Sequence, residues 1–210
     1  GTTSGVDASD PTWVCVTGGN ALDFDGDDDV VLAPDYDILN AITISAWIYA
    51  DTLTASDGII SKRTSTEAAG NWTLRVDNTY PDRLAWMIWD GSSSSDEQLS
   101  NASSISTGAW IHVAVTFDDA TNMTRFYFDG NPDASGTDIA IPLADNDEPI
   151  AIGWAGQGSQ NFDGRIDDVR IYNRVLSPAE ISALAASPPT DCSGNSPPSL
   201  TVDEPNGTGD

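Results

Sequence analysis

The sequence is poor in cations, in histidine and in cysteine. Eight Lys and Arg residues stand against 33 Asp and Glu residues among 210, so the formal net charge at pH 7 is −25. Nucleic acids and anionic membrane surfaces need a basic face on their partner, so this balance argues against both. No apolar run approaches the about 18 residues that a membrane-spanning helix requires. Residues 1–4 contain no apolar signal segment, so we expect any targeting peptide to have been removed or to lie outside this sequence.

The acidity has three interpretations. A solvated surface that keeps the protein soluble is the plainest one. Most of the acidic residues are Asp, whose oxygens suit the hard cation Ca²⁺. An Asp-rich, Lys-poor composition also resembles that of halophilic proteins, because salt screens self-repulsion. Composition alone leaves all three open.

Cys15 and Cys192 are the only cysteines, and they lie near opposite ends of the chain. With no CxxC spacing and a single histidine, we expect no zinc site. Either both thiols stay free or they form an end-to-end disulfide, which fits better. Closing so long a loop contributes at most about 5 kcal/mol in the chain-entropy model. A disulfide implies an oxidising compartment, so we expect a secreted or surface-exposed protein.

Short stretches of alternating apolar and polar residues, separated by Gly, Asp, Asn and Ser, recur along the chain. In 111–117, for example, Ile111, Val113, Val115 and Phe117 share one face, which is the period of a half-buried strand. The predicted strands are 13–16, 21–24, 30–32, 43–49, 58–61, 72–76, 84–89, 111–117, 124–128, 150–154 and 166–172. Turns about every 8–12 residues predict an antiparallel sandwich.

One stretch near the C-terminal end combines a turn, a strand and a helix start. Asp163 and Gly164 predict a tight turn, since glycine accepts positive φ values. Ser177 as N-cap, a proline after it and Glu180 at the third helical position predict a helix over 178–186.

The strand between them carries a carboxylate where an apolar residue is expected. By simple alternation, Asp167 shares a face with Val169 and Ile171. A carboxylate in that position costs several kcal/mol unless it is paired or bound to a metal.

The composition changes after residue 187. Residues 188–198 are rich in Pro, Ser and Gly and are typical of a linker. Residues 199–205 are interpreted either as the first strand of a following β-domain or as a tail. We therefore divide the chain into a domain over 1–192 and a linker over 193–210.

Four segments together resemble the concanavalin A-like domains of the laminin-G type. They are 21–26 with 29–31, then 44–48, then 110–116, then 162–181, in the order of the family. The resemblance spans about Ala21 to Ala185. It implies an all-β jelly roll of two packed antiparallel sheets with adjacent terminal strands and, here, one short C-terminal helix. It also implies frequent calcium binding and a role as an extracellular carbohydrate-binding or adhesion module, often within a larger protein.

This fold would bring the loop at 25–27 close to the strand residues 166–168. Calcium takes roughly six to eight oxygen ligands. The expected ligands are the Asp25 or Gly26 carbonyl and the carboxylates of Asp27 and Asp167. The alternative is a strand bulge in which Asp167 bonds backbone amides or Arg165 without a metal. The acidic triplet 27–29 is weak evidence by itself, because such triplets are common in loops.

Catalysis is not expected, although hydrolases and lyases share the fold. A retaining glycosidase needs two carboxyls about 5–5.5 Å apart, and no two Glu residues have the spacing of the related hydrolases. The related lyases need a His and a Tyr, yet His112 lies in the matched 110–116 segment and is expected to be a partly buried cross-strand residue. Without a second His, no Ser-His-Asp triad is identifiable.

Sugar-binding modules combine exposed aromatic rings with polar side chains. Trp154 lies where a strand runs into a Gly-rich loop and is interpreted as a stacking platform, with Gln157, Gln160 and Asn161 as polar partners. Trp89 is the second candidate. For each of these aromatic residues the alternative is packing at the rim of the core.

Two functions remain. One is a calcium-stabilised, non-catalytic carbohydrate-binding module of a larger secreted or surface protein, with a polysaccharide or glycan as partner. The other is a structural or protein-recognition module of a surface adhesin. Exposed aromatics along a groove favour the first, whereas complete burial of the tryptophans favours the second.

Overall fold

The computed structural model describes residues 10–16, 19–54, 56–63, 69–91, 95–101, 104–156, 158–186 and 201–203. Its larger sheet consists of β1 (Thr12–Val16), β2 (Gly19–Asp25), β4 (Ala41–Ala50), β9 (Trp110–Asp118), β10 (Met123–Phe128), β11 (Asn131–Gly136), β13 (Asp163–Tyr172) and β14 (Thr201–Asp203). Its smaller sheet consists of β3 (Val31–Ala33), β5 (Gly58–Lys62), β6 (Ala69–Val76), β7 (Leu84–Asp90), β8 (Ser95–Leu99) and β12 (Ile150–Ile152). One helix, α1 (Pro178–Ala185), completes the described elements.

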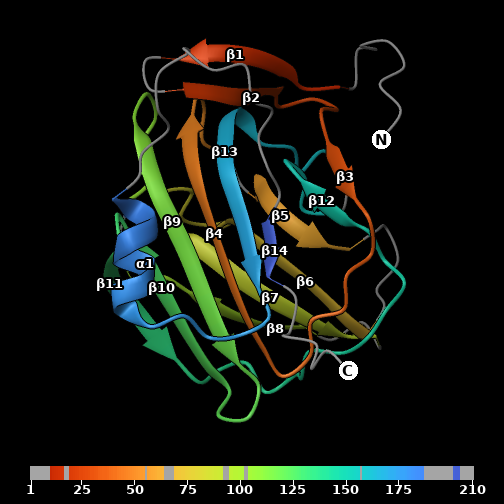
Figure 1. Cartoon of the computed structure of the whole chain (residues 1–210). Coiled ribbons are helices and arrows are strands. Elements are labelled where there is room, and N and C mark those ends of the chain that lie inside the picture. Colours follow the sequence, from red (N-terminus) through yellow and green to blue (C-terminus); the bar gives the residue numbers. More distant parts are fainter. Residues whose placement is uncertain are drawn as a thin grey trace, which may run out of the picture.

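The strand order is β1-β2-β13-β4-β9-β10-β11 in the larger sheet and β3-β12-β5-β6-β7-β8 in the smaller one (Figure 1). These neighbours are antiparallel, and only the added β14 runs parallel to its partner β13. The predicted antiparallel jelly-roll sandwich with one short helix is confirmed.

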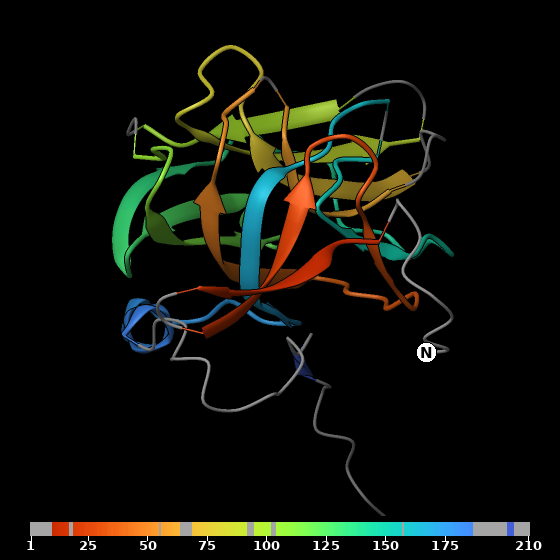
Figure 2. The same cartoon turned by 90° about the horizontal axis from the view of Figure 1, so that it is seen from above.

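The hydrophobic core lies between the two sheets, which Figure 2 shows from above. Val113, Val115 and Phe117 of β9 are fully buried in it, and Ile111 packs at its margin, as the alternation predicts. From the facing sheet come the buried side chains of Trp72, Leu74, Val76, Leu84, Trp86 and Ile88.

Helix α1 begins with the predicted capping box. The Ser177 hydroxyl accepts a hydrogen bond from the Glu180 amide at 3.3 Å, and the Glu180 carboxylate accepts one from the Ser177 amide at 2.8 Å. The helix packs through Ile181 on Ala114 and Tyr127 of the larger sheet. It therefore covers the outer face of that sheet over β9 and β10 (Figure 1).

Asp167 lies in a β-bulge of β13. The pairing with β4 shifts register between Asp167 and Arg170, and Asp168 has a φ of +48°. The Asp168 amide donates to the Asp167 carboxylate at 2.8 Å. Because a bulge adds one residue, Ile166 and Val169 both face the core, and Asp167 is only half-buried off that face. The expectation that Asp167 shares the core face with Val169 is therefore wrong, and the bulge alternative describes the strand.

At the C-terminal end, β14 pairs with β13 over Arg170 to Tyr172. The division at residue 192 and the following β-domain stay predictions. Cys192 lies outside the described residues, so its pairing with Cys15 stays a prediction too. None of the helices in the described ranges has the length and apolarity needed to cross a membrane.

Candidate functional site

Two connections lie side by side and form a cleft. One is the loop after β2, over residues 26–30, and the other joins β12 to β13 over residues 153–162. The cleft has a volume of about 250 Å³ and is lined by Asp27, Asp28, Val30, Trp154, Gly158 and Asn161. The loop predicted to bind calcium and the turn predicted to hold sugar thus meet in one place.

Trp154 is held in its turn by one hydrogen bond from its side chain and one to its main chain. Its indole Nε1 donates to the Gly158 carbonyl at 3.1 Å, and its own carbonyl accepts from the Ser61 hydroxyl of β5 at 2.9 Å. The residue is half-buried and lines the cleft. Because its single N–H group is already bonded, the indole offers a ligand its ring surface rather than a donor.

Asn161 connects the two walls of the cleft. The residue is buried, with 7% of its surface exposed, and it forms a backbone bridge with Trp154. Its side-chain amide nitrogen donates to the main-chain carbonyl of Asp27. The position of the loop after β2 therefore depends on the same turn that carries Trp154.

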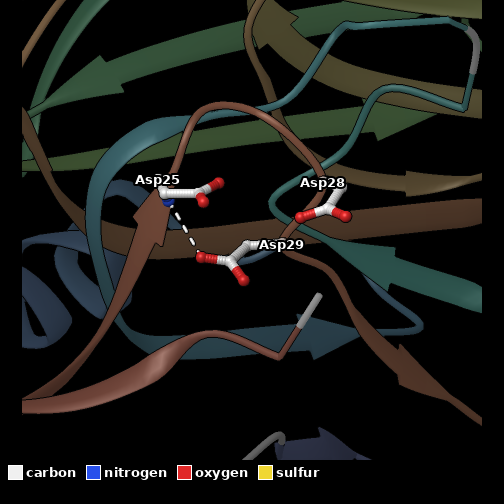
Figure 3. A group of neighbouring side chains, drawn as sticks. All are labelled: Asp25, Asp28 and Asp29. Carbon is white, nitrogen blue, oxygen red and sulfur yellow. Dashed lines mark hydrogen bonds between the residues drawn. The ribbon is translucent and has the colours of Figure 1, made fainter. Parts of the chain in front are cut away.

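Three carboxylates gather on this loop. Oxygen atoms of Asp25, Asp28 and Asp29 lie within 4.8 Å of one another, and Figure 3 shows the Asp25 and Asp28 carboxylates pointing toward each other. Asp29 Oδ2 accepts from the Asp25 amide at 2.9 Å, and Asp25 Oδ1 accepts from the Asp27 amide at 2.9 Å. These bonds fix the curvature of the loop and hold the carboxylates together.

Asp29 is the buried member of this group, with 5% of its surface exposed. Burial raises the pKa of its carboxyl, the hydrogen bond from Asp25 opposes the rise, and the negative charges of Asp25 and Asp28 add to it. A divalent cation would relieve both the burial and the mutual repulsion of the carboxylates. The group offers carboxylate oxygens, which are the ligands that a hard divalent cation prefers.

The family described as the concanavalin A-like lectin/glucanases superfamily, in its laminin-G type, matches residues 24–182. The chain belongs to this superfamily. The matched residues run from the end of β2 to α1, so this superfamily domain includes both walls of the cleft.

Two curated relatives of the superfamily domain are much longer proteins. A rat protein with sushi, von Willebrand factor type A, EGF and pentraxin domains is 29% identical over 74% of this chain, and zebrafish adhesion G-protein coupled receptor V1 is 26% identical over 72%. The chain spans only 4% and 2% of these two relatives, respectively.

Solved structures show the same fold. Domain 4 of an extracellular arabinanase from Geobacillus stearothermophilus, in complex with arabinotriose, has a TM-score of 0.63 at 24% identity, covering 83% of this chain and 81% of that one. A sialidase carbohydrate-binding module from Ruminococcus gnavus, bound to sialyllactose, has a TM-score of 0.56 at 15% identity, covering 82% and 96%. These likenesses show the fold, which occurs both in a domain of an enzyme and in a carbohydrate-binding module.

In the structure, Asp167 lies away from the acidic loop that carries Asp25, Asp28 and Asp29. Asp163 is the β13 residue opposite Asp25, and a Cβ placed on Gly26 would lie 2.8 Å from the Asp163 Cβ. Asp167 lies four residues farther along the strand, which is about 13 Å at the rise of a β-strand. Of the predicted calcium ligands, Asp25 and Gly26 lie in the acidic loop. The carboxylates that gather there are those of Asp25, Asp28 and Asp29, so the predicted carboxylates of Asp27 and Asp167 are not part of this cluster.

The predicted sugar-binding residues have different outcomes. Trp154 and Asn161 line the cleft, whereas Gln157 lies outside the described residues. Gln160 is half-buried, and its carbonyl accepts from the amides of Gly58 and Ala155, so its main chain holds the turn.

Trp89 is not an exposed platform. Only 6% of its surface is exposed, and the Arg63 guanidinium lies 3.8 Å from its ring centroid. A cation over an aromatic face is a stable pair, so the ring is packed beneath Arg63. This corrects the prediction that Trp89 contacts a ligand.

Sequence reasoning missed several residues of the site. Asp28 and Asp29 belong to the acidic triplet that was set aside as weak evidence, and Val30 follows it. The available signal was local: the triplet directly precedes the predicted strand at 30–32, which puts its carboxylates on the loop that leads into that strand. Gly158 gave no signal, because its part in the site comes from the bond to Trp154.

Proposed function

We propose that the chain is a non-catalytic, calcium-binding carbohydrate-binding module of a larger secreted or surface protein, and that the cleft holds the glycan. The observation that carries this proposal is the pairing of the half-buried Trp154, which lines the cleft, with the polar groups of Asp27, Asp28 and Asn161 in the same cleft. Sugar rings present apolar C–H faces and hydroxyl edges, so a stacking surface beside hydrogen-bonding groups matches them.

The calcium part of the proposal rests on the loop beside the cleft. Asp25, Asp28 and Asp29 supply carboxylate oxygens within 4.8 Å of one another, and carbonyls of the loop and water would complete the shell of roughly six to eight oxygens. Because Asp28 also lines the cleft, an ion held here would order one wall of the glycan site.

The comparisons support the class of function. Two of the structural neighbours are complexes with arabinotriose and with sialyllactose, and one relative is an adhesion G-protein coupled receptor. The long relatives agree with a module inside a larger polypeptide, and the extracellular arabinanase agrees with a secreted parent. The proposed Cys15–Cys192 disulfide would suit such a location.

The second candidate, a structural or protein-recognition module, depends on burial of the tryptophans. Trp47, Trp72, Trp86 and Trp89 are buried, which agrees with that candidate. Trp154 is only half-buried and lines the cleft, and this favours glycan binding.

Replacing Trp154 with Ala should weaken glycan binding by roughly tenfold to a hundredfold, because truncating a central aromatic contact removes about 2 kcal/mol or more. The measurement is a glycan array with calcium present, followed by titration of the best ligand. Trp13→Ala is the matched control, since Trp13 is 51% exposed on β1 and is absent from the cleft lining. Equal binding by both variants would contradict the site, and binding of a protein partner but no glycan would favour the second candidate.

Removing calcium should lower the melting temperature by roughly 5–10 °C in low-salt buffer. An ion at about 100 times its dissociation constant stabilises the folded state by about 2.7 kcal/mol, and a domain of this size gains about 2–4 °C per kcal/mol. Differential scanning calorimetry with calcium and with a chelator measures the shift.

The matched variants for this experiment are Asp29→Asn and Asp138→Asn. An amide at position 29 can still accept the hydrogen bond from the Asp25 amide but carries no negative charge, so calcium should bind more weakly and the calcium-dependent shift should shrink. Asp138 is exposed on the chain after β11, and its variant should keep the shift. Identical melting curves with calcium and with chelator for the unmodified protein would sink the metal proposal.

A further inference from the structure

We propose that the cleft selects neutral glycans and rejects glycans that carry carboxylates, an inference that rests on the proposed function and names its ligand class. The first reason is the charge of the walls. Asp27 and Asp28 are the charged side chains that line the cleft, and the other lining residues, Val30, Trp154, Gly158 and Asn161, carry no charge. A uronic or sialic acid would place its carboxylate against two others.

The second reason is the supply of hydrogen-bond donors. A carboxylate ligand needs N–H or O–H donors, and three N–H groups at this cleft already bond within the protein. Trp154 Nε1 donates to Gly158, the Asn161 side-chain nitrogen donates to the Asp27 carbonyl, and the Asp27 amide donates to Asp25. The carboxylates of the walls accept hydrogen bonds, so they match the hydroxyl groups of a neutral sugar.

The third reason is that the cations near the cleft have other partners. Arg63 packs beside this turn, since a Cβ on Gly156 would lie 2.8 Å from the Arg63 Cβ, but its guanidinium lies on Trp89 and 5% of the residue is exposed. Arg165, on the strand that follows the turn, pairs with Asp23 at 3.2 Å. Neither guanidinium is among the groups that line the cleft.

A bound calcium ion would not reverse this selection. The loop carries four carboxylates in five residues, those of Asp25, Asp27, Asp28 and Asp29, and one divalent ion balances half of their charge. With a net charge of −25 on the chain, the long-range field also repels polyanions. The cleft therefore stays negative with the ion in place.

The experiment is a glycan array with calcium present. The array includes pairs of glycans that share the same sugar chain and differ in charge. Fully methyl-esterified and de-esterified oligogalacturonates form one pair, and oligomannose and oligomannuronate of the same linkage form another. We expect the glycans that bind well to be neutral. Where both members of a pair bind, the neutral member should bind at least about tenfold more tightly at low salt. Raising the salt concentration should narrow this gap, because screening weakens the repulsion.

Asp27→Asn tests the cause. The main-chain bonds of Asp27 to Asn161 and Asp25 survive this change, while one wall charge is lost, so the preference for the neutral member should fall about threefold. Asp138→Asn removes the same charge outside the cleft lining and should leave the preference unchanged. Tighter binding of the anionic member at low salt would overturn the inference while glycan binding itself stands. Absence of binding to every glycan, by protein that is folded, would overturn the proposed function and the inference with it.

Discussion

Replacing Gly164 with Ala should destabilise the domain by about 3 kcal/mol or more and could prevent folding at 37 °C. Gly164 has a φ of +136°, and a Cβ on it would lie 2.1 Å from the Tyr49 carbonyl oxygen and 3.0 Å from the Ala50 Cα. Backbone atoms of β4 cannot move away without breaking the pairing between β13 and β4. The variant therefore combines a backbone conformation that L-residues rarely adopt with a steric overlap in a buried sheet.

Urea unfolding followed by tryptophan fluorescence measures this loss. The matched control is Gly108→Ala, because Gly108 also has a positive φ, of +76°, but the nearest atom to its Cβ would be the Tyr49 hydroxyl at an ordinary 3.8 Å. The control carries the conformational cost of about 1–2 kcal/mol without the overlap. Equal losses of unfolding free energy for the two variants would show that the steric overlap between β13 and β4 contributes nothing to the effect of Gly164→Ala.

Gly164 also shows where a local pattern misleads. Asp163 and Gly164 predict a tight turn, yet β13 begins at Asp163 and Gly164 lies inside the strand. Glycine is needed there for the close approach of a neighbouring strand, a tertiary requirement that the sequence around it does not express. The bulge at Asp167 is similar: the alternation is visible, but the residue at which it shifts is set by pairing with β4.

Elements with strong local signals were predictable. The apolar periodicity of β4 and β9 and the capping box of α1 each specify an element without help from the rest of the chain. β8 and β11 were missed because their sequences, SDEQL and NPDASG, are polar. Both lie at sheet edges, and most of their side chains are exposed or only half-buried, so they need few apolar residues.

The candidate site was predictable in pieces and not as a whole. A tryptophan at the start of a Gly-rich loop and an Asp-rich loop are visible separately, but their junction depends on the pairing of β2 with β13, in which Asp163 lies opposite Asp25. Trp89 was assigned wrongly because its exposure was inferred only from the Asp-Gly pair that follows it in the sequence. The Arg63 side chain that covers the ring comes from the end of another strand, which the local sequence does not reveal.

The free energy of unfolding should fall by about 3 kcal/mol between pH 7 and pH 4 because of His112 alone. Burial lowers the pKa of this imidazole from 6.5 to about 4, with Asp129 and Asp168 opposing the shift and Arg170 adding to it. Between these two values the unfolded chain binds a proton that the folded domain does not, so stability is lost as the pH falls through this window. Carboxyls with raised pKa values, such as those of Asp29 and Asp167, act in the opposite direction.

His112→Phe isolates this contribution, because the ring contact with Trp47, at 5.4 Å between centroids, can be kept while the proton site is removed. The carboxyls are common to both proteins, so the difference between their unfolding free energies should rise by about 3 kcal/mol from pH 7 to pH 4. A constant difference across this range would contradict the buried, neutral imidazole. Glycan binding at pH 7 should not change in the variant. A general base works best with a pKa near the operating pH, so a histidine that stays neutral down to about pH 4 is suited to packing between strands.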